Sequence, residues 1–204
     1  MLQERINRKW FKCMNLPNKI TLFRFLLIPI IVIVDLIGPL KEEVYFGYLT
    51  LNNIIMLGIF LLGAFSDFLD GHIARKRNLV TSFGKFMDPL ADKMLVFTTL
   101  ILLLNQDNVL TGWVIIVMLA REFMVSGLRM LAAEKGQVIA AGMLGKIKTN
   151  IQFLLIVLLL VFGMLDKSVT NIIISVVMYL AVIFTLWSGI DYLIKGKDVI
   201  FESK

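Results

Sequence analysis

The sequence predicts an all-α, polytopic membrane protein with six transmembrane helices. Of its 204 residues, 58% are hydrophobic and only 18% are charged, and the mean hydropathy is +0.84. A soluble domain of this length could not bury so much apolar surface, because a small domain leaves a large share of its chain facing water. The composition therefore excludes an ordinary soluble domain and a disordered chain.

Six apolar segments are each long enough, or nearly so, to cross a bilayer, which takes about 20 residues. The third and fourth are short as purely apolar runs, so their helices are expected to continue through neighbouring polar residues. Tight connections after the third and fifth segments predict antiparallel neighbouring helices. The six segments cover residues 20–37, 48–65, 90–104, 109–124, 147–165 and 169–186.

The basic residues predict how the chain is oriented. Nineteen of the 21 Lys and Arg residues fall on one side of the six segments, and only Lys41 and Lys167 fall on the other. The positive-inside rule then places both termini and the two long polar stretches in the cytoplasm. The net charge of +6 thus reflects topology and attraction to anionic membrane lipids. No soluble basic face remains for a nucleic-acid partner.

Residues 1–14 form a separate juxtamembrane segment before the membrane domain of residues 15–204. Leu2, Ile6, Trp10 and Met14 recur every four residues with basic residues between them. This spacing predicts a short amphipathic helix on the inner leaflet. A basic leader without fixed structure fits the same residues equally well.

Four aspartates predict a metal site at the ends of the second and third apolar segments. Asp67 and Asp70 share one helical face, and Asp88 and Asp92 share another. Four adjacent carboxylates repel one another unless cations neutralise them. Oxygen ligands favour Mg²⁺ or Mn²⁺ over Zn²⁺, and a pair of such ions suits phosphoryl chemistry. Interfacial salt bridges explain any one aspartate as well, but not all four at helical spacing.

With its intervals, the segment reads Asp67-x2-Asp70-Gly71-x2-Ala74-Arg75-x8-Gly84-x3-Asp88-x3-Asp92. It resembles in full the signature of the CDP-alcohol phosphotransferase family. Residues 15–24, 121–129, 145–149 and 187–192 resemble the bacterial branch that makes phosphatidylglycerophosphate. The resemblance implies a homodimeric six-helix enzyme of the bacterial plasma membrane. Such an enzyme transfers a phosphatidyl group from CDP-diacylglycerol to sn-glycerol 3-phosphate and releases CMP.

The resemblance also implies a role for each matching residue. Asp67 and Asp88 would bridge two metal ions, Asp70 would bind one ion, and Asp92 would bind the other and act as general base on the acceptor hydroxyl. The donor would be bound by Asn18, Thr21, Gly71, Ala74, Arg75, Thr81 and Gly84.

A phosphorylated acceptor needs cations around its phosphate. Arg121 and Arg129 are about 80° apart around a helix and could face one pocket. Lys146 and Lys148 begin the fifth segment on the same side. Flanking of the membrane by basic residues is the alternative explanation. Other acceptors, namely inositol phosphate or phosphatidylglycerol, stay open, as does a divalent-cation transporter that uses the aspartates for a different function.

Two residues allow two structural readings each. Pro89 could stand at the first turn of a helix capped by Asp88, or inside a helix that starts near Thr81 or Ser82. The family resemblance favours the second reading. Arg24 could extend to the membrane interface or approach the donor phosphates.

Overall fold

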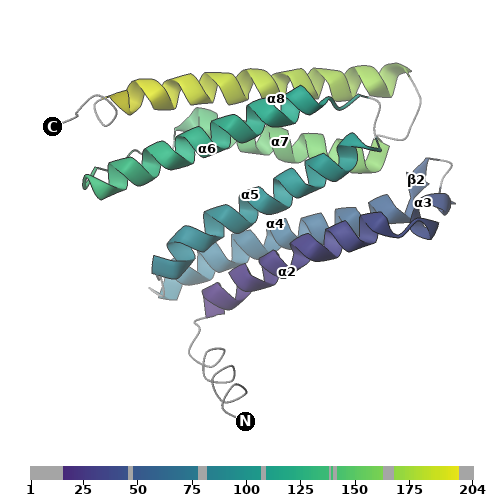
Figure 1. The fold of residues 1–204 in the computed structure, drawn as a ribbon, viewed down its shortest axis with the longest axis horizontal. Helices are drawn as coiled ribbons and strands as arrows, with labels where there is room; N and C mark the ends of the chain where they lie inside the picture. The colour runs from purple at the N-terminus through teal and green to yellow at the C-terminus, as the bar shows by residue number, and fades with distance from the viewer. Residues whose placement is uncertain are drawn as a thin grey trace, which may run out of the picture.

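A computed structural model describes most of the chain as a bundle of long helices (Figure 1). For residues 16–17, 70–77, 82–86 and 168 the structure describes the backbone only. The elements are α2 (Leu16–Leu36), α3 (Pro39–Glu42), β1 (Val44–Tyr45), β2 (Leu49–Thr50), α4 (Leu51–Arg77), α5 (Ser82–Leu104), α6 (Gly112–Glu134), α7 (Met143–Phe162) and α8 (Ser168–Lys195). The described residues are 16–45, 48–77, 82–106, 109–137, 139, 142–162 and 168–197.

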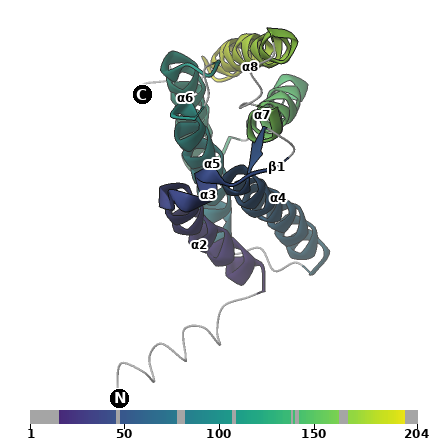
Figure 2. The same cartoon turned by 90° about the vertical axis from the view of Figure 1, so that its right-hand side faces the viewer.

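The six long helices run in alternating directions. The starts of α2, α5 and α7 and the ends of α4, α6 and α8 therefore lie together, on the left of Figure 1. α2 packs mainly against α4 and α5, whereas α8 packs against α6 and α7. Figure 2 shows α2 and α4 in the lower part of the bundle, α6, α7 and α8 in the upper part, and α5 near the centre.

Helix ends follow local chemistry. α6 ends where Gly136 adopts a positive φ of 71°. The amide of Gly136 then donates to the carbonyl of Ala133, and that of Gln137 donates to the carbonyl of Ala132. This pair of bonds is the Schellman arrangement, which satisfies the last carbonyls of a helix and favours glycine at that position. The chain can therefore leave α6 at the end of the bundle where the aspartates lie.

Most of each predicted apolar segment lies on one long helix, but residues 49–50 form β2, residues 109–111 precede α6, and residues 163–165 lie outside the described part of the chain. α5 begins at Ser82 with Pro89 inside it, so the reading favoured by the resemblance is confirmed. α6 likewise continues to Glu134, beyond its apolar run. The short helix α3 and the antiparallel pair β1–β2, with Val44 opposite Thr50, were not anticipated. They connect α2 to α4 at the other end of the bundle.

The outer surface of the bundle is apolar, as in a membrane protein. Large side chains such as Ile33, Ile116 and Leu186 are more than half or about half exposed. Among the described residues, three helices are long and apolar enough to cross a membrane: Leu51–Leu69, Met143–Phe162 and Val169–Lys195. α2, α5 and α6 have 21, 23 and 23 residues, and these three helices carry most of the charged residues described below. The structure is thus that of an all-α membrane protein.

A polar cluster closes the end of the bundle opposite the aspartates. Asp35 is 8% exposed and forms an ion pair with Lys41 at 3.0 Å. It accepts hydrogen bonds from the side-chain amides of Asn52 and Gln106. Thr21 and Asp35 are separated by about 21 Å along α2. The buried charges therefore occupy both ends of the bundle, with an apolar core between them.

Candidate active site

Three of the four predicted aspartates lie together at one end of the bundle. Asp67 is near the end of α4, and Asp88 and Asp92 are near the start of α5, which packs against α4. The charges of Asp88 and Asp92 both act on Asp67. The structure therefore brings acidic residues from the two halves of the sequence motif into one electrostatic environment.

Helix α2 supplies partners for two of these carboxylates. Arg24 is completely buried, and its guanidinium lies 2.9 Å from an oxygen of Asp67. Arg24 also donates a hydrogen bond to the hydroxyl of Ser66 at 3.4 Å. The hydroxyl of Thr21 donates a hydrogen bond to the carboxylate of Asp88. The guanidinium of Arg24 does not reach the surface, which argues against its extension to the membrane interface, whereas its approach to the donor phosphates stays a prediction.

Several predicted residues lie outside the described part of the chain. The backbone of residues 70–77 and 82–86 is helical, but nothing is described of the side chains in these ranges, and Thr81 is not described at all. Asn18 lies three residues before Thr21 on α2 and is 8% exposed. Among the residues whose side chains are described, no group of three or more carboxylates, His or Cys is close enough to hold a metal ion. Of the predicted site residues, Asp70, Gly71, Ala74, Arg75 and Gly84 lie in these two ranges.

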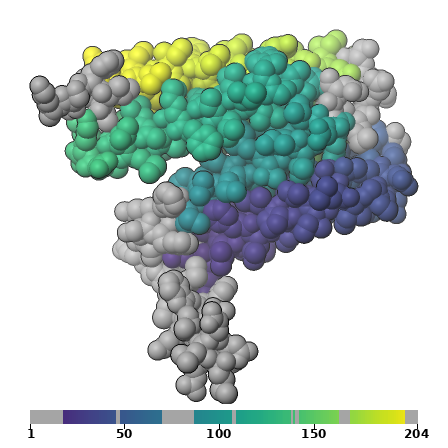
Figure 3. All heavy atoms as spheres, in the orientation of Figure 1, coloured from purple at the N-terminus to yellow at the C-terminus, as the bar shows by residue number. Residues whose placement is uncertain are grey.

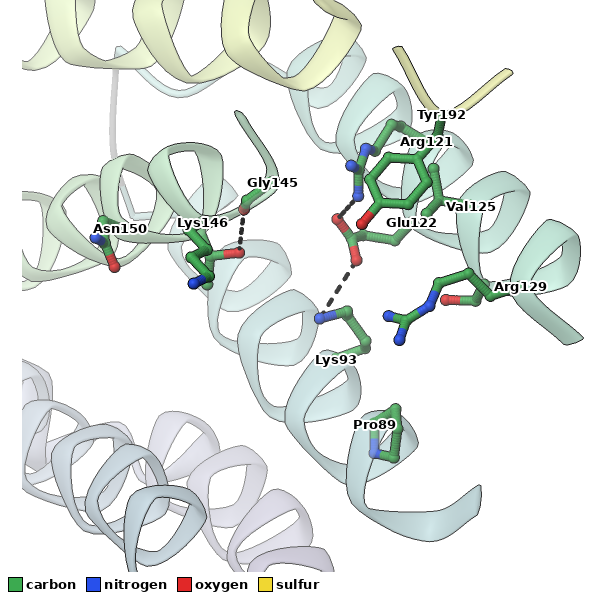
Figure 4. Close-up of a pocket in the computed structure, with 12 residues that line it drawn as sticks. Pro89, Lys93, Arg121, Glu122, Val125, Arg129, Gly145, Lys146, Asn150 and Tyr192 are labelled. Carbon is green, nitrogen blue, oxygen red and sulfur yellow. Dashed lines mark hydrogen bonds and ion pairs between the residues drawn. The ribbon is translucent and has the colours of Figure 1, made fainter. Parts of the chain in front are cut away.

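A cavity of about 470 Å³ opens beside the aspartates, between α5, α6, α7 and α8. Figure 3 shows the surface hollowed between the end of α6, in green, and the start of α5, in teal. Figure 4 shows that Lys93 of α5 points toward Glu122 of α6 among the lining residues. The charged and aromatic side chains of the lining are Lys93, Arg121, Glu122, Arg129, Lys146 and Tyr192.

Arg121 forms part of the cavity wall and is held on several sides. It lies 2.9 Å from Glu122 and donates to the hydroxyl of Ser188. Its guanidinium also stacks 5.3 Å from the ring centre of Tyr192. Gly189 allows this arrangement, since a Cβ there would lie 3.2 Å from the Arg121 side chain. The orientation of Arg121 is thus determined by α6 and α8 together.

The other three predicted acceptor cations occupy two kinds of environment. Arg129 and Lys146 line the same cavity, are exposed, and make no ion pair within the described part of the chain. Lys148 is 2% exposed and pairs with Glu122. It lines a smaller cavity of about 60 Å³, which Asp92 also lines. Two of the four predicted acceptor cations, Arg129 and Lys146, are therefore accessible, whereas Arg121 and Lys148 are buried and paired with Glu122.

Lys93 and Glu122 line the cavity as well, although the sequence did not predict either of them as a site residue. Lys93 lies 3.0 Å from Asp92 and 3.3 Å from Glu122. Glu122 is 6% exposed. The sequence does hold a signal for both, because a charged residue within an apolar segment is costly and needs a partner. Hydropathy shows that such a partner exists but does not say which residue it is.

Comparison with known proteins gives consistent matches over nearly the whole chain. Residues 14–187 match the family model described as CDP-alcohol phosphatidyltransferase. A protein of Bacillus subtilis named CDP-diacylglycerol–glycerol-3-phosphate 3-phosphatidyltransferase is 41% identical, over 93% of this chain and 98% of its own length. A protein of the same name from Rickettsia felis is 36% identical, over 87% of this chain and 93% of its own length. One from Haemophilus influenzae is 34% identical, over 93% of this chain and 97% of its own length.

Proposed function

The chain belongs to the CDP-alcohol phosphatidyltransferase family, and from this premise we propose that it transfers the phosphatidyl group of CDP-diacylglycerol to sn-glycerol 3-phosphate. The products are phosphatidylglycerophosphate and CMP. The observation that carries this proposal is the identity of 34–41% to transferases of that name over almost the whole length of both chains. The cation-lined cavity beside the aspartates supports it, because the acceptor carries a phosphate.

We propose that all six long helices cross the plasma membrane of a bacterium. Residues 15–204 then form the membrane domain, and residues 1–14 lie on its inner surface. The alternating helix directions bring the starts of α2, α5 and α7 and the ends of α4, α6 and α8 to one end of the bundle, and these are the helix ends that basic residues flank in the sequence. This distribution supports a cytoplasmic position for both termini and for the active site. A soluble acceptor and CMP would exchange freely there, while the lipid donor stays in the membrane.

We also propose that two Mg²⁺ or Mn²⁺ ions are held by Asp67, Asp70, Asp88 and Asp92. The chemistry of the donor set supports this proposal, because carboxylate oxygens are the preferred ligands of these ions and Asp67, Asp88 and Asp92 lie at the same end of the packed helices α4 and α5. Bound there, the ions would neutralise the pyrophosphate of the donor and the charge that develops on the leaving CMP.

The residues of the chain then have the following tasks. Asn18, Thr21, Gly71, Ala74, Arg75, Thr81 and Gly84 bind the nucleotide end of the donor. Asp92 accepts the proton of the attacking acceptor hydroxyl. The hydroxyl oxygen forms a new bond to the phosphorus of the phosphatidyl group, and the bond from this phosphorus to the CMP oxygen breaks. A carboxylate suits this role only within hydrogen-bond reach of the hydroxyl, so the placement of Asp92 matters.

The acceptor phosphate is proposed to bind in the cavity of 470 Å³. Arg129 and Lys146 are exposed toward it and have no competing ion pair among the described residues. Arg121 and Lys148 complete the set of four cations from the surrounding wall. Lys93 connects this cavity to Asp92. As in the family that it resembles, we expect the enzyme to work as a homodimer.

The test is an acceptor panel with purified protein, CDP-diacylglycerol and Mg²⁺, in which released CMP is measured. Glycerol 3-phosphate should give the fastest release, and inositol phosphate, phosphatidylglycerol or serine should give little. CMP release with another alcohol, but not with glycerol 3-phosphate, would contradict the proposed acceptor. Metal flux through vesicles without any dependence on nucleotide would instead favour the transporter alternative.

Removal of metal gives a separate prediction. Chelation with EDTA should abolish CMP release, and added Mg²⁺ or Mn²⁺ should restore it, because the carboxylates alone would repel the pyrophosphate. Zn²⁺ at the same free concentration serves as the control ion and should restore much less. Full turnover in the presence of EDTA would rule out the proposed metal site.

A further inference from the structure

Glu122 is a buried carboxylate that contacts cations from three helices. One oxygen, Oε1, faces Arg121 of its own helix α6 at 2.9 Å and also pairs with Lys148 of α7. The second oxygen, Oε2, lies 3.3 Å from Nζ of Lys93 on α5. Figure 4 shows Arg121 and Lys93 converging on this carboxylate from different sides. The two oxygens therefore have different partners, and one of them is directed toward Lys93.

Lys93 in turn connects Glu122 to Asp92. Its Nζ lies 3.0 Å from Oδ2 of Asp92, so a single ammonium group bridges two carboxylates. Lys93 lines both the large and the small cavity, and Asp92 lines the small one. A lysine has a flexible stem and a point charge, so its position depends on the groups that hold it. Here two carboxylates hold it at the boundary between the cavities.

We infer that Glu122 is a positioning residue for the transfer reaction: it holds Lys93 beside Asp92 and thereby sets the orientation of the Asp92 carboxylate. The inference rests on the proposed function, in which Asp92 takes the acceptor proton. Glu122 itself touches no reacting atom. Its effect matters because a proton acceptor must lie within about 3.2 Å of the proton donor, and a misplacement of about 1 Å can reduce the rate about 100-fold.

Charge balance explains why Glu122 is needed for this arrangement. Lys93, Lys148 and Arg121 contribute three positive charges, and Asp92 and Glu122 contribute two negative charges. Without Glu122, Arg121 and Lys148 would lose the carboxylate that they share, and Asp92 would be the only carboxylate paired with Lys93 among the described residues. Lys93 would then be drawn fully onto Asp92 or toward an acceptor phosphate, because no other described carboxylate pairs with it. In either case the carboxylate of Asp92 would lose its present position.

The test is a double-mutant cycle of Glu122→Gln and Lys93→Gln, with turnover measured in the wild-type and variant proteins. Each single variant should lower kcat by about 10- to 100-fold while leaving the KM for CDP-diacylglycerol within about twofold. The double variant should be no slower than the slower single variant, because both changes break the same link. Glu122→Asp keeps the charge and should recover part of the lost kcat.

Asp35→Asn is the matched control. Asp35 is buried to a similar degree, at 8% against 6% exposed, and is also ion-paired, but it lies at the opposite end of the bundle. This substitution should lower the melting temperature of the protein in detergent, but the kcat of the folded protein should stay close to that of the wild type. If Glu122→Gln does not fold, Lys93→Gln still breaks the link and leaves Glu122 paired with Arg121 and Lys148.

Three outcomes would overturn the inference. They are unchanged kcat in Lys93→Gln, multiplicative losses in the double variant, or a loss of kcat in Asp35→Asn equal to that in Glu122→Gln. The assay uses whichever acceptor supports turnover of the wild type, so failure of glycerol 3-phosphate as acceptor would be seen separately. Melting temperatures of the same four proteins of the cycle provide a readout without catalysis: Lys93 and Glu122 should show non-additive changes there as well.

Discussion

Single charged residues in this protein are positioned by the cost of burying charge. A charged group away from water needs a partner, and removing that partner leaves an uncompensated charge. Arg24 meets Asp67, Lys148 meets Glu122, and Asp35 meets Lys41. Arg129 and Lys146, by contrast, are exposed beside the cavity and need no partner from the protein. The exposed cations are therefore the ones available to a phosphate.

Asp92→Asn tests the residue proposed as general base. The change keeps the size of the side chain but removes most of its ability to accept a proton, so CMP release should fall by about 100-fold or more. Binding of CDP, measured by calorimetry in the presence of Mg²⁺, should change far less. Near-normal turnover in this variant would exclude Asp92 as the base.

Arg129→Ala tests the accessible cations of the cavity. Loss of a charge-assisted contact to phosphate should raise the KM for the acceptor by about 10-fold, with a smaller effect on the donor. Lys195→Ala is the control, because Lys195 is an exposed cation at the same end of the bundle, paired with Asp191 and outside the cavity lining. A larger effect on the donor KM would move Arg129 to the donor site.

At the scale of the helices, Gly63 allows α4 to pack closely against α5. A Cβ on Gly63 would lie 2.2 Å from Cδ2 of Leu95 and 3.6 Å from the side chain of Leu27. Leu95 is 3% exposed, so it has little room to move. Gly63 is one helical turn before Asp67 on α4. The packing that brings α4 close to α5 therefore also sets the distance between Asp67 and the aspartates of α5.

Gly63→Ala should lower the free energy of unfolding by about 1–3 kcal/mol through overpacking. Gly58→Ala on the same helix is the matched control: no atom lies within 4 Å of its added Cβ, so it should be neutral or stabilise by up to about 1 kcal/mol. Both can be followed by thermal unfolding in detergent. Equal effects of the two substitutions would show that contact with Leu95 is unimportant.

The positions of the long helices can be predicted from local sequence, whereas the short elements cannot. The apolar runs predict where the long helices lie, because hydropathy is a property of consecutive residues. The favoured start of α5 near Ser82 is confirmed, with Pro89 inside the helix. α3 and the pair β1–β2 were not predicted, because each has only a few residues and such short elements have no periodicity to detect. The roles of Lys93 and Glu122 were missed because the pairs Lys93–Glu122 and Lys148–Glu122 join residues on different helices that are far apart in the sequence.

At the scale of the whole molecule, the up-and-down order of the helices collects one end of each at a common face. Among the residues whose side chains are described, Arg129, Lys146 and Lys195 belong to the helix ends at the face with the aspartates. In a bacterial plasma membrane this face is expected to be cytoplasmic. The opposite face holds the polar cluster of Asp35 and Lys41. The asymmetry of charge between the faces thus gives the molecule a predicted orientation.

Cysteine labelling tests this orientation. In a Cys13→Ser background, Lys41→Cys should react with a membrane-impermeant maleimide in spheroplasts, and Glu134→Cys should react only after permeabilisation. Both positions are exposed and lie at opposite ends of the bundle, so each serves as control for the other. The reverse labelling pattern would contradict the cytoplasmic placement of the active site.

The sequence by itself determined the membrane class, the positions of the six long helices and the aspartate motif whose resemblance led to the family. These features depend on composition and on short spacings. The tertiary structure alone decided that Glu122 meets Lys93 and Lys148, and that Arg129 and Lys146 line a cavity while Lys148 is buried. The physical reason is that a buried charge pairs with whichever opposite charge the fold places near it, however far apart the two residues are in the sequence. Packing of α5, α6 and α7 brings together residues that are more than 20 positions apart in the chain.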